Sequence, residues 1–244
     1  VRASVVRSSS LVRRPPQPPA ASGSVPSAGV IAPTGGVRPY HSREGMRKVD
    51  GIGNAHVTNA GTLDVTATTN DATGMFATTY YDGYVYVGNS GSIQVSAYNN
   101  GFGVYADSGG AGRVTVDNSG TISITSAQGV VEGIHTSSNA GDSYVYNGGS
   151  IGITTYGAGG TMEGINAYAQ NTLYVRNDGD ITIDAQGAGS SAIGIQAINF
   201  AAYDLTVDSY GSISVDATAQ ARGIYIGGND GNVYVNTGGT IDAG

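Results

Sequence analysis

From residue 51 onward, apolar and polar side chains alternate in short runs that return in a fixed order. The first kind of run is typified by Val85–Val87 and the second by Ile93–Val95, while the third follows a glycine, as in Gly164–Ala167. Alternation with a period of two places successive side chains on opposite faces of a β-strand. The pattern therefore predicts three short strands in each unit, with apolar side chains pointing inward and polar ones outward.

These runs form a repeat. A glycine precedes the second strand seven times, at intervals of 28 to 32 residues: Gly61, Gly91, Gly120, Gly149, Gly179, Gly211 and Gly239. Such units bury their apolar faces against one another. We therefore predict an all-β parallel β-helix, or β-solenoid, with three short strands per coil, about 30 residues per coil and six to seven coils. Parallel crossovers are almost always right-handed, so we expect a right-handed solenoid.

A column of asparagines marks one corner of the predicted coil. It stands two residues before the first five of these glycines and consists of Asn59, Asn89, Asn118, Asn147 and Asn177. Asn tolerates a positive φ, and its amide can bond the Asn one coil away to form a ladder. We expect a tight corner here, with the adjacent glycine serving the same steric need.

Residues 1–50 differ from the repeat in composition and charge. Ser, Pro, Ala and Arg dominate, with Arg13–Pro19 at the centre, and such a segment cannot bury a core. Residues 1–48 hold eight basic side chains and one acidic, whereas the remainder holds three basic and 17 acidic. We expect residues 1–50 to form a basic extended tail or leader-like segment, and residues 51–244 the solenoid domain. An acidic solenoid would repel nucleic acid.

The repeat unit resembles the passenger repeats of autotransporters and related β-solenoid adhesins of Gram-negative bacteria. Val87–Val95 and Val116–Ile124 carry the resemblance most clearly, and it covers roughly residues 52–244. It implies an extracellular or cell-surface protein exported through an outer-membrane barrel. The sequence shows no barrel domain, which leaves a cleaved passenger, a fragment or a stand-alone solenoid. An organellar location is the alternative if the first segment is a transit peptide.

The charged side chains of the repeat suggest no complete catalytic site. Glu132 and Glu163 take the same place in successive units, and His135 lies nearby. Adjacent carboxylates with a histidine can exchange protons or hold a cation, so a polysaccharide-active enzyme is a minor alternative. Because Arg222 lies about two coils away, no basic residue supports the pair. We expect both carboxylates to point to solvent at a turn, with no enzyme activity and no metal.

No other sequence feature calls for a cofactor or a membrane. The chain contains no Cys, which excludes disulfides, thiolate metal sites and a cysteine nucleophile. No apolar run approaches the ~18 residues of a membrane-spanning helix. We therefore expect no cofactor and no transmembrane segment.

Tyrosines gather on the outward face of the first strands. The set consists of Tyr84, Tyr86, Tyr144, Tyr146, Tyr174 and Tyr234. Such a face can stack sugar rings or pack against another subunit. The alternative is that Tyr simply favours strands and stabilises its own ladder.

The coil ends suggest a function. The repeat begins near Ile52 and stops at Ile241 without polar caps, so we expect the ends to stack through Ile52, Val57, Leu63, Val235 and Ile241. The leading interpretation is a non-enzymatic, extracellular, structural and adhesive β-solenoid that polymerises head to tail. The alternative is an adhesin that binds glycans, on a host or matrix surface, through its Tyr-rich face.

Overall fold

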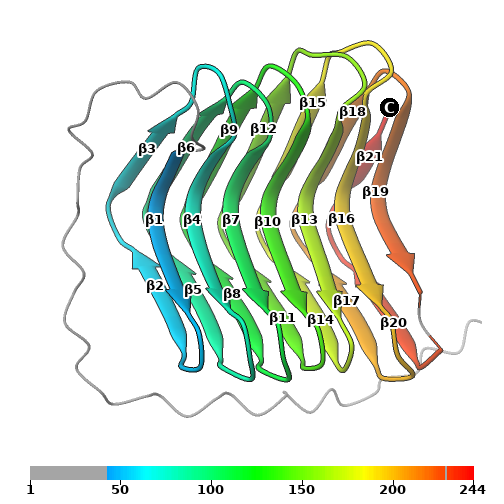
Figure 1. Ribbon diagram of the computed structural model, residues 1–244. Helices are drawn as coiled ribbons and strands as arrows, with labels where there is room; N and C mark the ends of the chain where they lie inside the picture. Colours follow the sequence, from blue (N-terminus) through cyan, green and yellow to red (C-terminus); the bar gives the residue numbers. More distant parts are fainter. Residues whose placement is uncertain (1–42, 229) are drawn as a thin grey trace, which may run out of the picture. The chain divides into compact units, whose positions relative to one another are not determined.

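The structure, a computed structural model, describes residues 43–228 and 230–244. These residues form 21 β-strands and no helix, wound as three strands per coil over seven coils (Figure 1). Every strand pairs in parallel with the equivalent strand of the next coil, which builds three seven-stranded sheets. The predicted parallel β-solenoid is confirmed. No helix in this part of the chain has the length and apolar character needed to cross a membrane.

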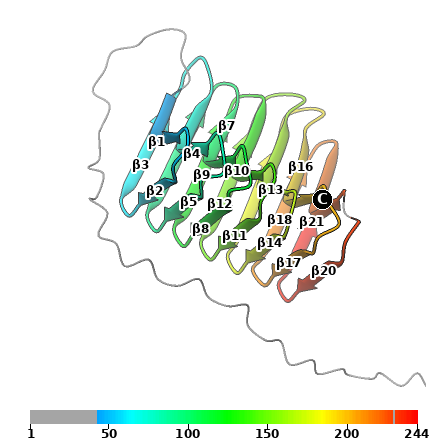
Figure 2. The ribbon, with the colours of Figure 1, turned by 60° about the horizontal axis from the view of Figure 1, so that its bottom comes forward.

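The three sheets, here called A, B and C, run the length of the solenoid and are seen from a second direction in Figure 2. Sheet A contains β1 (Arg43–Asp50), β4 (Ala72–Thr79), β7 (Gly101–Ser108), β10 (Val130–Ser138), β13 (Thr161–Ala169), β16 (Ser191–Asn199) and β19 (Gln220–Gly227). Sheet B contains β2 (Ala55–Asn59), β5 (Val85–Asn89), β8 (Val114–Asn118), β11 (Ser143–Asn147), β14 (Leu173–Asn177), β17 (Leu205–Ser209) and β20 (Val233–Thr237). Sheet C contains β3 (Thr62–Thr66), β6 (Ser92–Ala97), β9 (Thr121–Ser126), β12 (Ser150–Thr155), β15 (Ile181–Ala185), β18 (Ile213–Ala217) and β21 (Ile241–Ala243).

The core consists of aliphatic columns that run along the solenoid axis. Ile151 pairs in register with Ile122 on one side and Ile181 on the other, and all three side chains are almost fully buried. Sheets A and B contribute equivalent columns, such as Ile134 beside Ile165. Each coil thus buries its apolar side chains against the coils on both sides, which is the source of stability in a repeat protein.

Sheet A departs from simple alternation at a glycine within each strand. In β13, Met162 and Ile165 both enter the core although they stand three positions apart, with Glu163 and Gly164 between them. The ladder pairs Glu132 with Glu163 and then Ile134 with Ile165, and omits the glycines. One residue is therefore inserted at the glycine, as in a β-bulge, and the strand bends there. The sequence pattern had placed this glycine before the third strand. In the structure it lies inside the strand.

The asparagine column forms the predicted ladder. From Asn59 to Asn147, each side-chain Nδ2 donates to the Oδ1 of the Asn in the next coil, at 2.9 Å from Asn59 to Asn89 and at 2.7 Å from Asn118 to Asn147. The side chains are buried. The conformational explanation was wrong, because no residue other than glycine has a positive φ in the described part of the chain. Asn is required here for its two-sided amide, which both donates and accepts along the column.

Glycine is required in the adjacent column for a reason that the sequence did not reveal. Neither Gly91 nor Gly120 has a positive φ. A Cβ added to Gly91 would clash with the carbonyl oxygen of Gly61, and one added to Gly120 would clash with that of Gly91. Glycine is therefore needed because the backbones of successive coils approach closely at this corner.

The solenoid begins earlier than the boundary predicted at residue 51. β1 covers residues 43–50 and pairs in parallel with β4, so it belongs to the first coil. The basic character of the preceding segment concealed this strand, because Arg47 and Lys48 lie on it and are exposed. The rest of the predicted tail, residues 1–42, lies outside the described residues.

Candidate functional site

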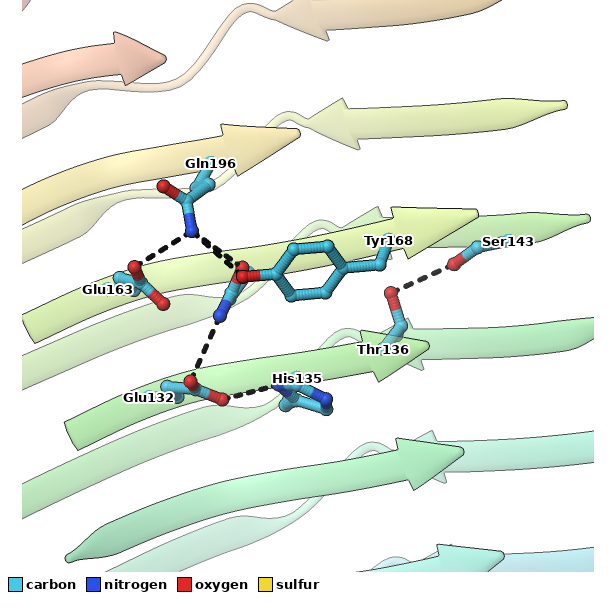
Figure 3. Close-up of polar contacts among 8 residues, drawn as sticks. Glu132, His135, Thr136, Ser143, Glu163, Tyr168 and Gln196 are labelled. Atoms are coloured by element: carbon cyan, nitrogen blue, oxygen red, sulfur yellow. Dashed lines mark hydrogen bonds and ion pairs between the residues drawn. The ribbon is translucent and has the colours of Figure 1, made fainter. Parts of the chain in front are cut away.

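A polar cluster lies on the outer face of sheet A, where the strands bend. Glu132 and His135 come from β10, Glu163 and Asn166 from β13, and Gln196 from β16 (Figure 3). The bend brings outward side chains on either side of the glycine together. Glu132 and Glu163 are each only 6% exposed. The expectation that these carboxylates point to solvent at a turn was therefore wrong, because both lie within strands and under neighbouring side chains.

Amide side chains connect the cluster from coil to coil. Asn166 Nδ2 donates to Glu132 Oε1 at 2.9 Å, and Gln196 Nε2 donates to Glu163 Oε1 at 2.9 Å. Gln196 Nε2 also lies 3.1 Å from both Asn166 Oδ1 and the hydroxyl of Tyr168. Sequence reasoning did not single out these amides. The sequence could have identified these amides, because His135, Asn166 and Gln196 occupy the same outward position in successive coils.

His135 completes the cluster through a close but poorly aligned contact. Its Nδ1 lies 2.6 Å from Glu132 Oε2, yet neither atom has a well-oriented hydrogen bond, and both are shielded from solvent. The imidazole stacks on Tyr105 with a centroid distance of 4.4 Å, and Tyr105 stacks on Phe76 at 5.2 Å. The ring faces in this column are occupied by one another, so they offer no free platform for a sugar ring.

The cluster holds two carboxyl groups without a strong cation. Burial and, second to it, the nearby Glu132 raise the pKa of Glu163 to about 7. Arg222 occupies the Glu163 column two coils away and lies over the ring of Tyr225, 4.9 Å from its centroid. Glu163 therefore keeps its proton up to a higher pH than an exposed glutamate does. The described residues contain no group of three or more side chains suited to a metal ion.

The predicted Tyr-rich face is found on the outer side of sheet B. Tyr86, Thr115, Tyr144 and Tyr174 follow one another in register across β5, β8, β11 and β14. These tyrosines are half-buried, whereas Tyr84 and Tyr234 are exposed. The structure thus brings the predicted aromatic side chains onto one surface.

Arginine and aspartate side chains interleave with these rings. The guanidinium of Arg113 lies 5.8 Å from the ring of Tyr84 and 5.6 Å from that of Tyr144, in the coils on either side. Tyr146 and Tyr174 are in contact, with centroids 5.7 Å apart. The Tyr174 hydroxyl donates to Asp208 at 2.9 Å; burial and this hydrogen bond raise the pKa of Tyr174. This surface offers ring edges, guanidinium groups and carboxylates side by side.

An open hollow of about 190 Å³ lies at one edge of the Tyr-rich face. Its lining includes Tyr86, Gly88 and Asp117, together with the corner residues Asn59 and Asn89. It is shallow, and it is lined by side chains that already belong to the Tyr-rich face and the Asn ladder. It therefore extends that face and forms no separate site.

The side chains predicted for end stacking lie on the first and last coils, but they differ in exposure. Ile52 is 84% exposed in the turn between β1 and β2, Leu63 is half-buried, and Val57 is buried within the first coil. On the last coil Val235 is 46% exposed and Ile241 is 41% exposed. Three of the five side chains are therefore exposed, whereas Val57 belongs to the core.

Comparison with protein-family models, with curated proteins and with solved structures gives no match to this chain. The fold and the surfaces described above are therefore the basis for any statement about function.

Proposed function

We propose that this chain is a non-enzymatic structural and adhesive β-solenoid that acts outside the cell and assembles head to tail. The observation that carries the proposal is that the described coils pair with one another in one parallel register, a pairing that a coil of another copy can also supply. Val235 continues a column whose other members are buried, and Ile241 continues a column that is buried in the five preceding coils; both are more than two-fifths exposed. Exposed apolar side chains beside an unpaired strand edge favour association with another edge. The resemblance of the repeats to bacterial passenger domains supports the extracellular location.

Self-association can be measured directly by sedimentation velocity of the 244-residue chain at several concentrations. We expect the weight-average sedimentation coefficient to rise with concentration without reaching a closed oligomer, since head-to-tail contacts are open. The variant Val235→Lys places a charge among the exposed apolar side chains of the last coil, so it should remain monomeric. Thr125→Lys, an exposed position on β9 within the solenoid, is the matched control and should assemble normally. A wild-type chain that stays monomeric throughout would contradict the proposal.

A second candidate function is glycan binding by the Tyr-rich face. The specific observation in its favour is the row of Tyr86, Tyr144 and Tyr174, in which Tyr144 lies beside Arg113 and Tyr174 beside Asp208. Aromatic rings flanked by charged groups suit polyhydroxylated ligands. The triple substitution of these tyrosines by Ser should abolish binding to an immobilised panel of neutral and acidic polysaccharides while assembly persists. Tyr156→Ser, at an exposed turn after β12, is the control. Undiminished binding by the triple variant would eliminate this candidate.

The buried cluster on sheet A does not change the proposal. Catalysis by Glu132 and His135 would require access for a substrate, and their facing atoms are shielded from solvent. We therefore assign the cluster a structural role. Polysaccharide cleavage by the wild-type chain that is lost in Glu163→Gln would show instead that the cluster is catalytic.

A further inference from the structure

One outward column of sheet B lacks a side chain at Gly88. This glycine on β5 lies in register with Thr58 on β2 and with Asp117 on β8, and Tyr146 on β11 is the next member of the column. The open hollow of about 190 Å³ at the edge of the Tyr-rich face is lined by Thr58, Gly88 and Asp117. The missing side chain therefore leaves room for a ligand group between neighbouring coils.

Asp117 brings to this hollow a carboxylate whose charge is not compensated. Its side chain makes no hydrogen bond or ion pair within the part of the chain that the structure describes. It is open to solvent, so a ligand can reach it, yet burial by neighbouring atoms raises the pKa of Asp117. Arg113, four residues earlier, lies between the rings of Tyr84 and Tyr144. A partly desolvated carboxylate without a counter-charge favours a cationic ligand.

Tyr86 supplies an aromatic wall beside this carboxylate. A Cβ built at Gly88 would lie 3.1 Å from both Cε1 and the hydroxyl oxygen of Tyr86, so the ring reaches across the glycine. Burial and, second to it, the charge of Asp117 raise the pKa of Tyr86, which places the hydroxyl group near the carboxylate. An ammonium group is attracted by a carboxylate and by an aromatic ring. The two side chains together therefore suit a cation with an organic body.

The rim of the hollow adds neutral hydroxyl groups. Ser90 and Ser119 line it from the turns that follow β5 and β8. Their hydroxyls make only long contacts, of 3.4 Å and 3.5 Å, with backbone carbonyls of the preceding coil. Such hydroxyls can exchange hydrogen bonds with the hydroxyl groups of a ligand. The hollow thus combines a carboxylate, an aromatic ring and hydroxyl groups.

Asp117 differs in this respect from other carboxylates of the same surface. Asp208 accepts a hydrogen bond from the Tyr174 hydroxyl, and Asp142 accepts one from the backbone N–H of Thr172. Both of these carboxylates therefore already stabilise the solenoid itself. The Asp117 carboxylate remains available to a ligand.

Building on the glycan-binding candidate above, we propose that this hollow binds the protonated amino group of an amino sugar and that the Tyr-rich face thereby selects polymers of such sugars. Asp117 is the counter-ion of the ammonium group, and Tyr86 packs against the sugar ring. The charge of the solenoid favours the same class of ligand. Residues 49–244 hold three basic and 17 acidic side chains, which attract a cationic polymer and repel an acidic one.

Two ligands that differ only in acetylation test this assignment. One is the hexamer of β-1,4-linked glucosamine at pH 5.5, where most of its amino groups carry a proton, and the other is its neutral, fully N-acetylated counterpart. Isothermal titration calorimetry of the whole chain measures both affinities at 0.15 M salt, which screens exposed charges. We expect the wild type to bind the amino hexamer at least about tenfold more tightly than the acetylated one.

Asp117→Asn removes the charge and keeps the shape of the side chain. It should lower the affinity for the amino hexamer at least about tenfold and leave that for the acetylated hexamer unchanged. Asp64→Asn is the matched control, because it makes the same change of charge on the exposed outer face of sheet C. It should bind both hexamers as the wild type does. Equal losses in the two variants would show that net charge alone attracts the polymer, which would overturn the proposed site.

Gly88→Ala tests the hollow without changing any charge. The added methyl group would lie 3.1 Å from the Tyr86 ring and 3.4 Å from Cγ2 of Thr58, so it displaces the ring and fills the hollow. These contacts are with side chains of the outer face, so we expect an unchanged unfolding temperature. The affinity for the amino hexamer should fall at least about fivefold. An unchanged affinity would show that the ligand binds elsewhere.

Failure of the hollow and failure of glycan binding give different results. If the wild type binds polysaccharides and the triple Tyr variant does so equally well, the glycan-binding candidate fails and the amino-sugar site fails with it. If the triple variant loses binding but the wild type shows no preference for the amino hexamer, or Asp117→Asn keeps that preference, glycan binding by the face stands and the assignment to amino sugars is wrong.

Discussion

The fourth and seventh coils carry the same apolar pattern but bury it differently. Val145 in β11 and Ile151 in β12 have coils on both sides and are at most 1% exposed. Val235 and Ile241 take the equivalent positions in the last coil and are 46% and 41% exposed. The same residue types in the same columns are thus core in one coil and surface in the other. Burial in this fold is decided by the neighbouring coil, and only secondarily by the residue itself.

The outer face of sheet A shows the same contrast with polar side chains. In the fourth and fifth coils, Glu132 and Glu163 are buried beside amides and rings. In the last coil, the equivalent Arg222 is partly exposed and contacts Tyr225. The outer surface of sheet A is therefore closely packed around Glu132 and Glu163 and more open around Arg222.

The largest effect is expected where a substitution adds a side chain at the corner at which the backbones of successive coils approach closely. Gly120→Ala places a methyl group against the carbonyl of Gly91, and the stacked coils cannot separate there without breaking strand pairing. We expect a loss of at least about 4 kcal/mol in the free energy of unfolding, enough to leave much of the protein unfolded. The same substitution at Gly61, in the first coil, should change this free energy by less than about 0.5 kcal/mol. Urea denaturation of both variants compares them, and equal effects would contradict the difference between middle and end.

Truncation of matched core residues gives the next largest effect. Ile151→Ala removes a side chain enclosed by two neighbouring coils and should cost about 4 kcal/mol. Ile241→Ala removes the equivalent side chain at the open end and should cost less than about 1 kcal/mol in the monomer. Denaturant titrations at a concentration below that for assembly provide the measurement. Similar costs at the two positions would mean that the last coil is packed as tightly as the fourth.

The carboxyl pair of the central coils should make stability depend on pH. The pKa of Glu163 is raised from 4.5 to about 7 in the folded protein, so folding favours its neutral form. The stabilisation is therefore fully present below pH ~4.5 and is lost as the pH rises through about 7, with a magnitude on the order of 3 kcal/mol. Glu163→Gln is neutral and should remove this dependence. Burial also raises the pKa values of Asp107 and Asp117, which act in the same direction.

Unfolding midpoints between pH 4.5 and pH 8.5 test this prediction. The wild type should lose stability toward higher pH more steeply than Glu163→Gln, and Asp216→Asn on the exposed face of β18 should behave as the wild type. Parallel curves for the wild type and Glu163→Gln would show that Glu163 titrates as it does in the unfolded chain.

The smallest of these effects is expected in the asparagine ladder. Asn118 accepts from Asn89 and donates to Asn147, both at 2.7 Å, so Asn118→Ala leaves a buried donor and a buried acceptor without this partner. We expect a cost of about 2 kcal/mol. Ser209→Ala, near the end of the same column, removes only a long contact of 3.4 Å from Asn177 and should cost less than about 1 kcal/mol. Thermal melts of the two variants provide the comparison.

The sequence predicted the coil well because the repeat is long and its columns are regular. The spacing of Gly61 to Gly239 and the apolar alternation define three parallel sheets and their register, and the Asn column indicates its ladder. The glycine inserted within each strand of sheet A was less visible. It shifts the alternation by one residue, so the burial of Glu132 and Glu163 could not be inferred from a period of two. Contacts across the bend, such as Asn166 to Glu132, depend on that shift.

The sequence pattern also could not predict which side chains are exposed in the last coil, because Val235 and Val145 fit the pattern equally well. β1 was missed for the related reason that Arg47 and Lys48 occupy outward positions of an end strand, where charge is tolerated. Sequence periodicity therefore identifies columns, whereas the number of neighbouring coils determines what each member of a column contributes.

Electron microscopy of the purified chain at increasing concentrations tests most directly whether the ends join. Seven coils at a strand spacing of about 4.8 Å give an axial repeat of about 34 Å for each copy. We predict filaments with this repeat and with no gap between copies, which Val235→Lys should not form. Separate short rods at every concentration of the wild-type chain would contradict the account.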